Sequence, residues 1–358
     1  MNEEPGSSIG PIALFGSGET SPAAQRIHHE VMSRLSTPVR AAIIETPAGF
    51  EPNSDHVAGQ IGESMRHHLR NHDPQVTIVP ARKRGTPLSP DEAGIAALLP
   101  GSDVIFAGPG SPTYAVRQFQ HSLTWQTLVA CHRLGAAVVL ASAAAIASGT
   151  LALPVYEIYK VGEDPHWHEG LDFFDAFGLH LVVIPHWNNQ DGGEELDTSH
   201  GYMGRARFES LLELLPPGLT VVGIDEQTAL VLDLAEGSCR VLGKGGVTVR
   251  HEGNEQRYDR EASFSAGELG AFHPPSPLSG VQAEVYARIR TTLAKAQAGT
   301  PPIPPPRVLA LVDRREDARA RGDWATADDL RARIVALGWQ VNDTVGGPQL
   351  EPNGGELI

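Results

Sequence analysis

The stretch from Ala136 to Thr150 constrains the fold of this chain more than any other segment. It begins with a continuous apolar run, AAVVL, which predicts a strand buried on both faces of a parallel sheet. The small residues 143–147 that follow favour a helix. A single hydroxyl, Ser142, stands between the two segments. A sharp turn from strand to helix at this point exposes the serine Oγ at the sheet edge, beside the helix N-terminus.

Two interpretations of Ser142 are open. The first is a nucleophile elbow, although Leu140 and Ala144 stand where the usual pattern G-x-S-x-G has glycine. The second is a small buried serine that caps a helix.

Bulk composition restricts the class of protein. The 358 residues allow one large domain with an appendage, or two domains. The net charge of −15 argues against general binding to nucleic acids or membrane surfaces, and no apolar run is long enough to span a bilayer. Cys131 and Cys239 form no disulfide framework, and the acidic first residues lack the basic region of a signal peptide. We therefore expect a cytoplasmic protein.

Strand and helix patterns alternate along the first half of the chain. Strands are expected at 12–16, 39–46, 76–80, 103–108 and 136–141, and later at 179–185, 220–225 and 228–233, the last two joined by a tight turn. This spacing predicts an α/β fold with a doubly wound, mainly parallel sheet. Such sheets bind ligands beyond the carboxyl ends of their strands. Candidate substrate contacts in the corresponding loops are Gly18, Glu19, Glu45 and Ser111.

The loop at 108–113 has the composition of an anion-binding turn. Gly110 can adopt positive φ, and its N–H together with that of Ala143 would make a two-donor oxyanion hole, whereas Pro109 has no N–H. The alternative is an ordinary turn before a helix, with Ser111 or Thr113 as its cap.

His186 ends the apolar strand predicted at 179–185, a position suited to a general base. A structural role for this histidine is the alternative. The polar residues that follow it, Asn188 and Asn189 among them, either contact the substrate or form a plain surface loop.

A serine–histidine pair needs an acid to orient the imidazole. Glu157 is the first candidate because apolar and aromatic residues flank it, PVYEIY, although it also fits a surface position on a half-buried strand. Asp191, Asp197 and Asp225 are alternatives.

Histidine pairs at 28–29, 67–68 and 166/168 invite a metal interpretation. Adjacent helical residues diverge by about 100°, and the third pair has only Glu163 or Asp164 beside it, with no further strong ligand set. We expect no metal and no cofactor.

Five motifs, taken in chain order, resemble the cyanophycinase and dipeptidase E family over residues 10–250: GSGE, FAGPGSPT, VVLASAAA, VIPHW and GIDEQTAL. The resemblance implies a serine peptidase on a class I glutamine amidotransferase-like, flavodoxin-like fold. It matches Ser142 to the nucleophile, His186 to the base and the Gly108–Gly110 loop to an oxyanion donor, with Glu157 near the spacing of the acid. It also implies peptide substrates that contain aspartyl residues. Related amidotransferases carry cysteine at the elbow, so serine here argues against glutaminase chemistry.

The C-terminal part differs in character. A helix at 281–298 and a proline-rich linker ending at Pro306 lead to a predicted helical hairpin at 307–344, broken at Gly322-Asp323. This hairpin resembles the C-terminal helical appendage of cysteinyl-tRNA synthetases, which lies near tRNA. Seven arginines balance seven acidic residues in it, so the charge typical of RNA binding is absent, and a docking or dimerisation hairpin is the alternative.

The sequence therefore predicts three parts: an α/β domain at 1–275, a helix and linker at 276–306, and the hairpin unit at 307–358. The main hypothesis is a serine hydrolase acting on a small peptide or amide, with a homodimer as the expected assembly. The alternatives are a catalytically inactive ligand-binding protein on the same fold and an RNA-associated adaptor that acts through 307–344.

Overall fold

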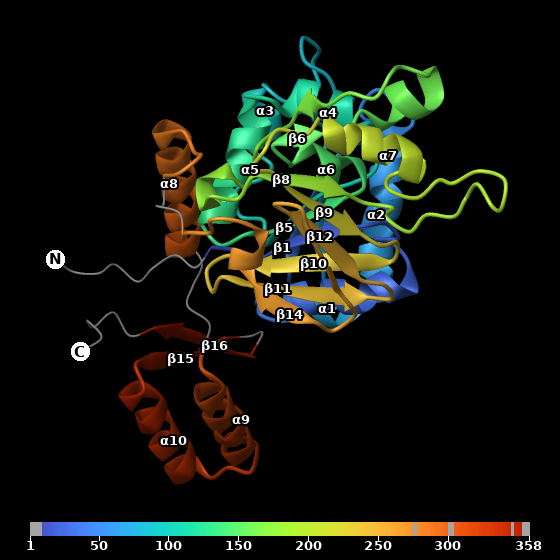
Figure 1. Ribbon diagram of the computed structural model, residues 1–358. Coiled ribbons are helices and arrows are strands. Elements are labelled where there is room, and N and C mark those ends of the chain that lie inside the picture. Colours follow the sequence, from blue (N-terminus) through green and yellow to red (C-terminus); the bar gives the residue numbers. More distant parts are fainter. Residues whose placement is uncertain (1–8, 275–277, 300–303, 345–346, 353–358) are drawn as a thin grey trace. The chain divides into compact units, whose positions relative to one another are not determined.

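The computed structural model describes residues 9–274, 278–299, 304–344 and 347–352 (Figure 1). The chain divides into two compact units, residues 1–290 and 291–358, and helix α8 (Ala283–Gly299) crosses the boundary. The predicted proline-rich linker lies partly outside the described residues, at 301–303.

An eight-stranded sheet forms the centre of the first unit, in the order β14-β11-β10-β1-β5-β4-β2-β3 (Figure 1). Its five parallel strands are β1 (Ile12–Phe15), β5 (Ala137–Ala141), β4 (Val104–Ala107), β2 (Arg40–Ile44) and β3 (Gln75–Val79). Three antiparallel strands extend it: β10 (Thr228–Asp233), β11 (Ser238–Gly243) and β14 (Ser263–Ser265). The large, mostly parallel sheet agrees with the prediction.

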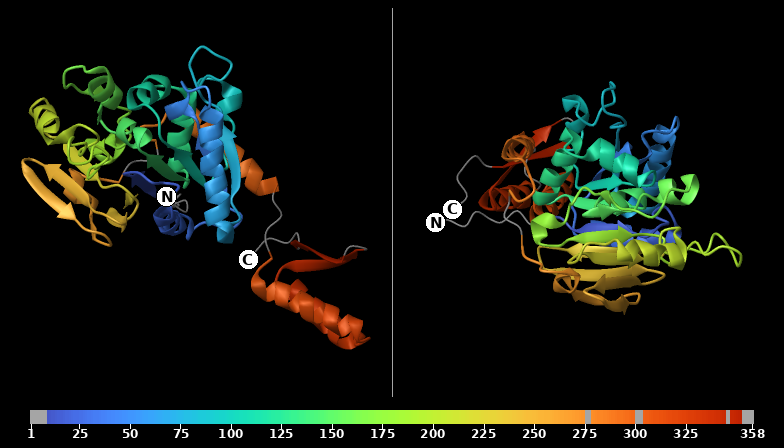
Figure 2. Two further views of the ribbon diagram at one scale, coloured as in Figure 1. Left: turned by 90° about the vertical axis from the view of Figure 1, so that its right-hand side faces the viewer. Right: turned by 45° about the horizontal axis from the view of Figure 1, so that its top comes forward.

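Helices cover the sheet because its central strands are apolar on both faces. On one face, α1 (Pro22–Met32) and α2 (Ser54–His68) bury a cluster that includes Phe15, Ile27, Met65 and Phe106. Figure 2 shows α2, in light blue, running along this face beside β2 and β3. The remaining longer helices of the unit are α4 (Pro112–Phe119), α5 (Leu123–Arg133) and α7 (Gly204–Glu213).

A second sheet has four strands in the order β13-β12-β9-β8: β13 (Asn254–Tyr258), β12 (Val247–His251), β9 (Thr220–Ile224) and β8 (Leu181–Ile184). The strands predicted at 220–225 and 228–233 are present, but they do not pair with each other. β9 pairs with β8 and β12, whereas β10 pairs with β1 and β11. The short turn between them therefore carries the chain from one sheet to the other, which local sequence spacing does not reveal.

The shorter elements connect these parts. They are the helices α3 (Ala93–Ala96) and α6 (Ala143–Ala147), the paired strands β6 (Leu151–Ala152) and β7 (His168–Glu169), a π-helical turn at Glu157–Val161, and 3₁₀ turns at Thr46–Ala48, Arg70–His72, Asp175–Phe177 and Ala266–Leu269.

The second unit contains a helical hairpin and a β-hairpin. The predicted break is confirmed: α9 (Pro306–Ala320) and α10 (Trp324–Ala336) flank Gly322, whose φ is 75°, and Asp323, whose carboxylate accepts from the N–H of Thr326. The helical prediction is wrong beyond α10, because β15 (Trp339–Thr344) pairs with β16 (Gly347–Pro352). Val308, Ile334 and Val341 belong to the shared core of both hairpins.

No helix in the described ranges combines the length and the apolar character needed to cross a membrane.

A buried histidine ties α5 to the start of β1. The Nδ1 of His132 accepts a hydrogen bond from the Arg133 guanidinium (2.9 Å), because arginine can only donate. Its Nε2–H then donates to the carbonyl oxygen of Gly10 (2.8 Å). Burial, reinforced by the Arg133 charge, lowers the pKa of His132 from 6.5 to about 3.

This histidine makes folding stability depend on pH. The pKa of His132 is lower in the folded chain than in the unfolded chain. The contribution of the neutral ring to the free energy of unfolding is therefore complete above pH 6.5 and is lost as pH falls toward 3. We expect the free energy of unfolding of the wild type to fall between pH 6 and pH 5 by about 1 kcal/mol more than that of His132→Gln. Urea titrations followed by circular dichroism test this, and parallel pH dependences in the two proteins would contradict it.

Candidate active site

The turn predicted at Ser142 is present. β5 ends at Ala141, α6 begins at Ala143, and Ser142 between them adopts φ 50° and ψ −112°. A non-glycine residue in such a sparsely populated region of φ and ψ destabilises the fold by about 1–3 kcal/mol. Strained residues of this kind cluster at functional sites. Leu140, fully buried in β5, and Ala144 do not prevent this turn although both replace glycine.

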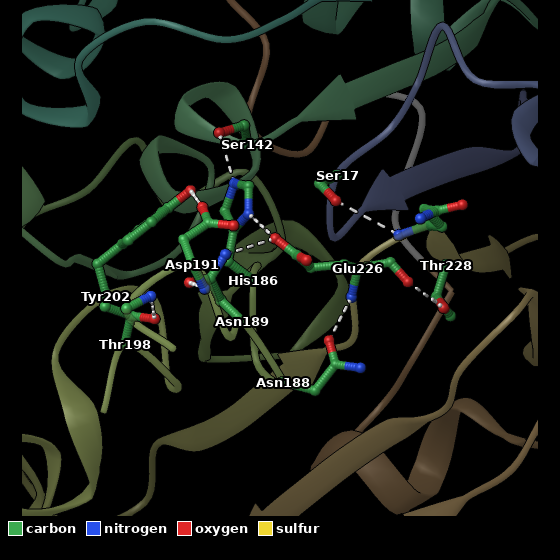
Figure 3. A network of polar contacts seen from close by, with 12 residues as sticks. Ser17, Ser142, His186, Asn188, Asn189, Asp191, Thr198, Tyr202, Glu226 and Thr228 are labelled. Carbon is green, nitrogen blue, oxygen red and sulfur yellow. Dashed lines mark hydrogen bonds and ion pairs between the residues drawn. The ribbon is translucent and has the colours of Figure 1, made fainter. Parts of the chain in front are cut away.

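The structure brings His186 to Ser142. His186 follows β8 and donates its backbone N–H to the carbonyl oxygen of Gly16, at the end of β1 (3.0 Å). Its Nε2 lies 3.2 Å from the Ser142 Oγ, and its Nδ1 lies 2.9 Å from the Glu226 Oε1 (Figure 3). Because a carboxylate only accepts, Nδ1 carries the proton, and Nε2 is left to accept from the serine hydroxyl.

The carboxylate that contacts His186 is therefore Glu226, not the predicted Glu157. Glu157 lies on the π-helical turn, where its Oε1 accepts from the Thr113 hydroxyl at 2.5 Å. The hydrogen bond from His186 lowers the pKa of Glu226 against the opposing effect of burial, and a bond from Asn189 adds to this.

The other carboxylates considered as the acid have different partners. Asp225 is buried and paired with the Arg257 guanidinium (2.6 Å). Asp197 accepts from the backbone N–H of Arg205, and this bond is the largest cause of its pKa of about 2. Asp191 accepts a long hydrogen bond from the Tyr202 hydroxyl (3.4 Å). None of these three forms a hydrogen bond or ion pair with the His186 ring in the described part of the chain.

Sequence reasoning missed Glu226 because it sits in the turn between β9 and β10, which leads from one sheet to the other. One signal was available: an acid directly after an apolar strand, in the motif GIDEQTAL that carried part of the family resemblance. The sequence does not indicate that this turn meets the loop after β8.

Asn188 and Asn189 hold Glu226. The Asn188 side-chain oxygen accepts from the backbone N–H of Glu226 (2.8 Å), and the Asn189 Nδ2 donates to its Oε1 (2.8 Å; Figure 3). These residues were predicted either as substrate contacts or as part of a surface loop, and in the structure Asn188 binds the backbone of Glu226 while Asn189 binds its carboxylate.

Ser142 opens into a cavity of about 420 Å³. Gly110 and Ala143, which were predicted as oxyanion donors, line this cavity, and no hydrogen bond of either N–H occurs within the described residues. Only glycine fits at 110, because its φ is 149° and an added Cβ would lie 1.9 Å from the Pro47 carbonyl oxygen. Tyr202 forms part of the wall, and burial, followed by the nearby Asp191, raises its pKa to about 12.

The four remaining predicted substrate residues do not line this cavity. Glu45 is buried in an ion pair with Arg82 (2.6 Å), and Ser111 caps α4. Glu19 lines a small cavity beside His28, and burial raises its pKa. Gly18 adopts φ 70°.

A larger cavity of about 1430 Å³ shares Tyr156 with the cavity at Ser142. Thr113 and Glu157 line it, together with Lys83 and Arg117. The residues from Gly110 to Thr113 thus contribute alternately to the linings of the two cavities.

Asp172, Asp175 and His180 form the group in the described residues whose geometry comes closest to a metal site, with ligand atoms within 4.8 Å of one another. All three are exposed, and the Asp172 Oδ1 already accepts from Thr150. This group does not include the His166-x-His168 pair considered from the sequence.

Comparison with solved structures supports the fold of the first unit. A crystal structure of a peptidase from an acI-B1 Actinobacterium superposes with a TM-score of 0.57 and 22% identity, covering 73% of this chain and 98% of that one. Similarity at this level of identity establishes the fold.

The second unit has relatives of a different kind. The family model for the cysteinyl-tRNA ligase anticodon binding domain matches residues 302–349. Cysteine–tRNA ligases of Methanosarcina mazei and Chlamydia pneumoniae are 41% identical over 68 residues and 38% over 69, each covering 19% of this chain. The matches span only 14% and 15% of those enzymes, so the similarity concerns this appendage alone.

The backbone strain at Ser142 predicts an inverted effect of glycine. At an ordinary position glycine is less stable than alanine, but at this φ and ψ the alanine Cβ carries the strain. We expect Ser142→Gly to be more stable than Ser142→Ala by about 1 kcal/mol. Urea titration of the two variants checks this, and the usual order, with alanine the more stable, would contradict the strained turn.

Proposed function

We propose that the first unit is a serine hydrolase that cleaves a small peptide or amide. The single observation that carries this proposal is the alignment of Ser142, His186 and Glu226, with the serine on a strained turn. The fold shared with a protein described as a peptidase supports it.

The geometry supplies a role for each group. His186 Nε2 removes the hydroxyl proton while the Ser142 Oγ attacks the substrate carbonyl carbon. In this proposal the N–H groups of Gly110 and Ala143, which line the cavity, hold the resulting oxyanion. His186 then gives the proton to the amine as the C–N bond breaks and the acyl-serine forms. His186 next removes a proton from a water molecule that attacks the acyl-serine, and it returns this proton to the Ser142 Oγ as the acid product leaves. Glu226 fixes the imidazole tautomer and stabilises its transient positive charge.

The substrate class we propose is a peptide with an acidic, aspartyl-type group. The family resemblance suggests it, and Lys160 supports it because this cation lines the cavity that also contains Ser142. Lys160 lies over the Tyr159 ring, with its Nζ 4.8 Å from the ring centroid.

A fluorophosphonate probe tests the function, because such probes react only with an activated serine. We expect wild-type labelling to disappear in Ser142→Ala and His186→Ala. Glu226→Gln should slow labelling by a factor on the order of 10³–10⁴, whereas Glu157→Gln, a matched change of a carboxylate bound to Thr113, should leave the rate nearly unchanged. A well-folded wild type that is not labelled would instead support the ligand-binding alternative.

A second candidate function concerns the second unit, where the family match favours contact with tRNA. Trp324 is 62% exposed beside Arg319, whose guanidinium carbon lies 5.8 Å from the indole centroid, an arrangement on which an unpaired base can stack. Arg315 and Arg319 are two of the seven arginines in residues 307–344. Both form ion pairs with Asp343 of the same unit.

Fluorescence anisotropy with tRNA and the full-length chain tests this second function. We expect Trp324→Ala to weaken binding by about tenfold through the loss of one stacked base, and Leu309→Ala, a change at another exposed apolar side chain, to have little effect. Binding that is absent at moderate salt, or equal in the two variants, would argue for a docking hairpin.

A further inference from the structure

We infer that Asn189 is a positioning residue that holds Glu226 in register with His186. The inference rests on the proposed hydrolase function. Asn189 is buried, with 2% of its surface exposed, although a plain surface loop was one of the two interpretations of this stretch of sequence.

The orientation of this amide is fixed at both ends. Its oxygen accepts from the backbone N–H of Asp191 (3.1 Å), so its nitrogen must be the atom that faces Glu226. That nitrogen donates to the Glu226 Oε1 at 2.8 Å, the same oxygen that accepts from His186 Nδ1. One carboxylate oxygen therefore receives two converging N–H donors.

The backbone connects this amide to the histidine as well. The N–H of Asn189 donates to the carbonyl oxygen of His186 at 3.2 Å, which closes the loop directly after β8. Asn188 holds the backbone N–H of Glu226 at 2.8 Å. Two successive asparagines thus hold both ends of one glutamate, whose own turn belongs to a different part of the chain.

Asn189 affects the proposed reaction through the positions of Glu226 and His186. Without the Asn189 donor, Glu226 has one fewer fixed contact and is free to rotate away from the imidazole. His186 would then spend less time with Nε2 directed at Ser142, and small misplacements of reacting groups carry large rate penalties. Asn189 acts through Glu226 and His186 and does not touch the reacting atoms.

The test measures the rate of fluorophosphonate labelling at Ser142 against pH, in the full-length chain. Asn189→Ala should lower the limiting rate by roughly ten- to a hundredfold. Asn189→Asp, nearly identical in shape, places a second carboxylate beside Glu226 and favours the charged imidazole. The acid limb of its labelling profile should therefore move to higher pH by about one unit. The matched control is Asn342→Ala, which removes an asparagine bound to Glu351 in the second unit and should change nothing.

The outcomes separate the two claims. If wild-type labelling is absent or survives in Ser142→Ala, the proposed hydrolase function fails and this inference falls with it. If Ser142 is labelled normally while both Asn189 variants, folded by circular dichroism, keep the wild-type rate and acid limb, only the positioning role is overturned.

Discussion

The turn between β9 and β10 depends on the ion pair between the buried Asp225 and the half-exposed Arg257, and the site depends on that turn. The Asp225 carboxylate, 2% exposed, accepts from the Arg257 guanidinium (2.6 Å) and from the N–H of Gly246 (2.8 Å). Removal of Arg257 would leave the buried Asp225 carboxylate without a compensating charge. Gly16, at the end of β1, lies so close that an added Cβ would be 2.0 Å from the Asp225 carbonyl oxygen. The main sheet and the second sheet are therefore held against each other at Asp225, the residue before Glu226.

The three side chains of the candidate site come from three strand ends. Ser142 follows β5 of the main sheet, His186 follows β8 of the second sheet, and Glu226 follows β9 beside it. The backbone bond from His186 to Gly16 joins the second sheet to β1, which is the neighbour of β5. The main-chain framework therefore sets the spacing of serine, histidine and acid, and the asparagines after β8 adjust only the last contact.

The second unit has a separate core, closed by the pairing of β15 with β16 and by the nearly buried guanidinium of Arg315, which binds Asp343. Its similarity to tRNA ligases covers this unit, whereas the peptidase-like fold covers most of the rest. Each unit therefore has its own candidate surface: the cavity at Ser142 in the first, and Trp324 with Arg319 in the second.

The sequence by itself determined the five parallel strands and β10 of the main sheet, the turn at Ser142, the candidate base His186 and the break at Gly322, because each depends on local polarity and backbone preference. Only the tertiary structure decided which acid meets His186. Glu157 has the apolar surroundings of a buried acid but binds Thr113, whereas Glu226 lies in a short turn that resembles a hairpin. Hydrophobic periodicity indicates which face of an element is buried, but it does not indicate which loops meet. It therefore could not predict the contact between Glu226 and His186, which forms where the chain passes from one sheet to the other.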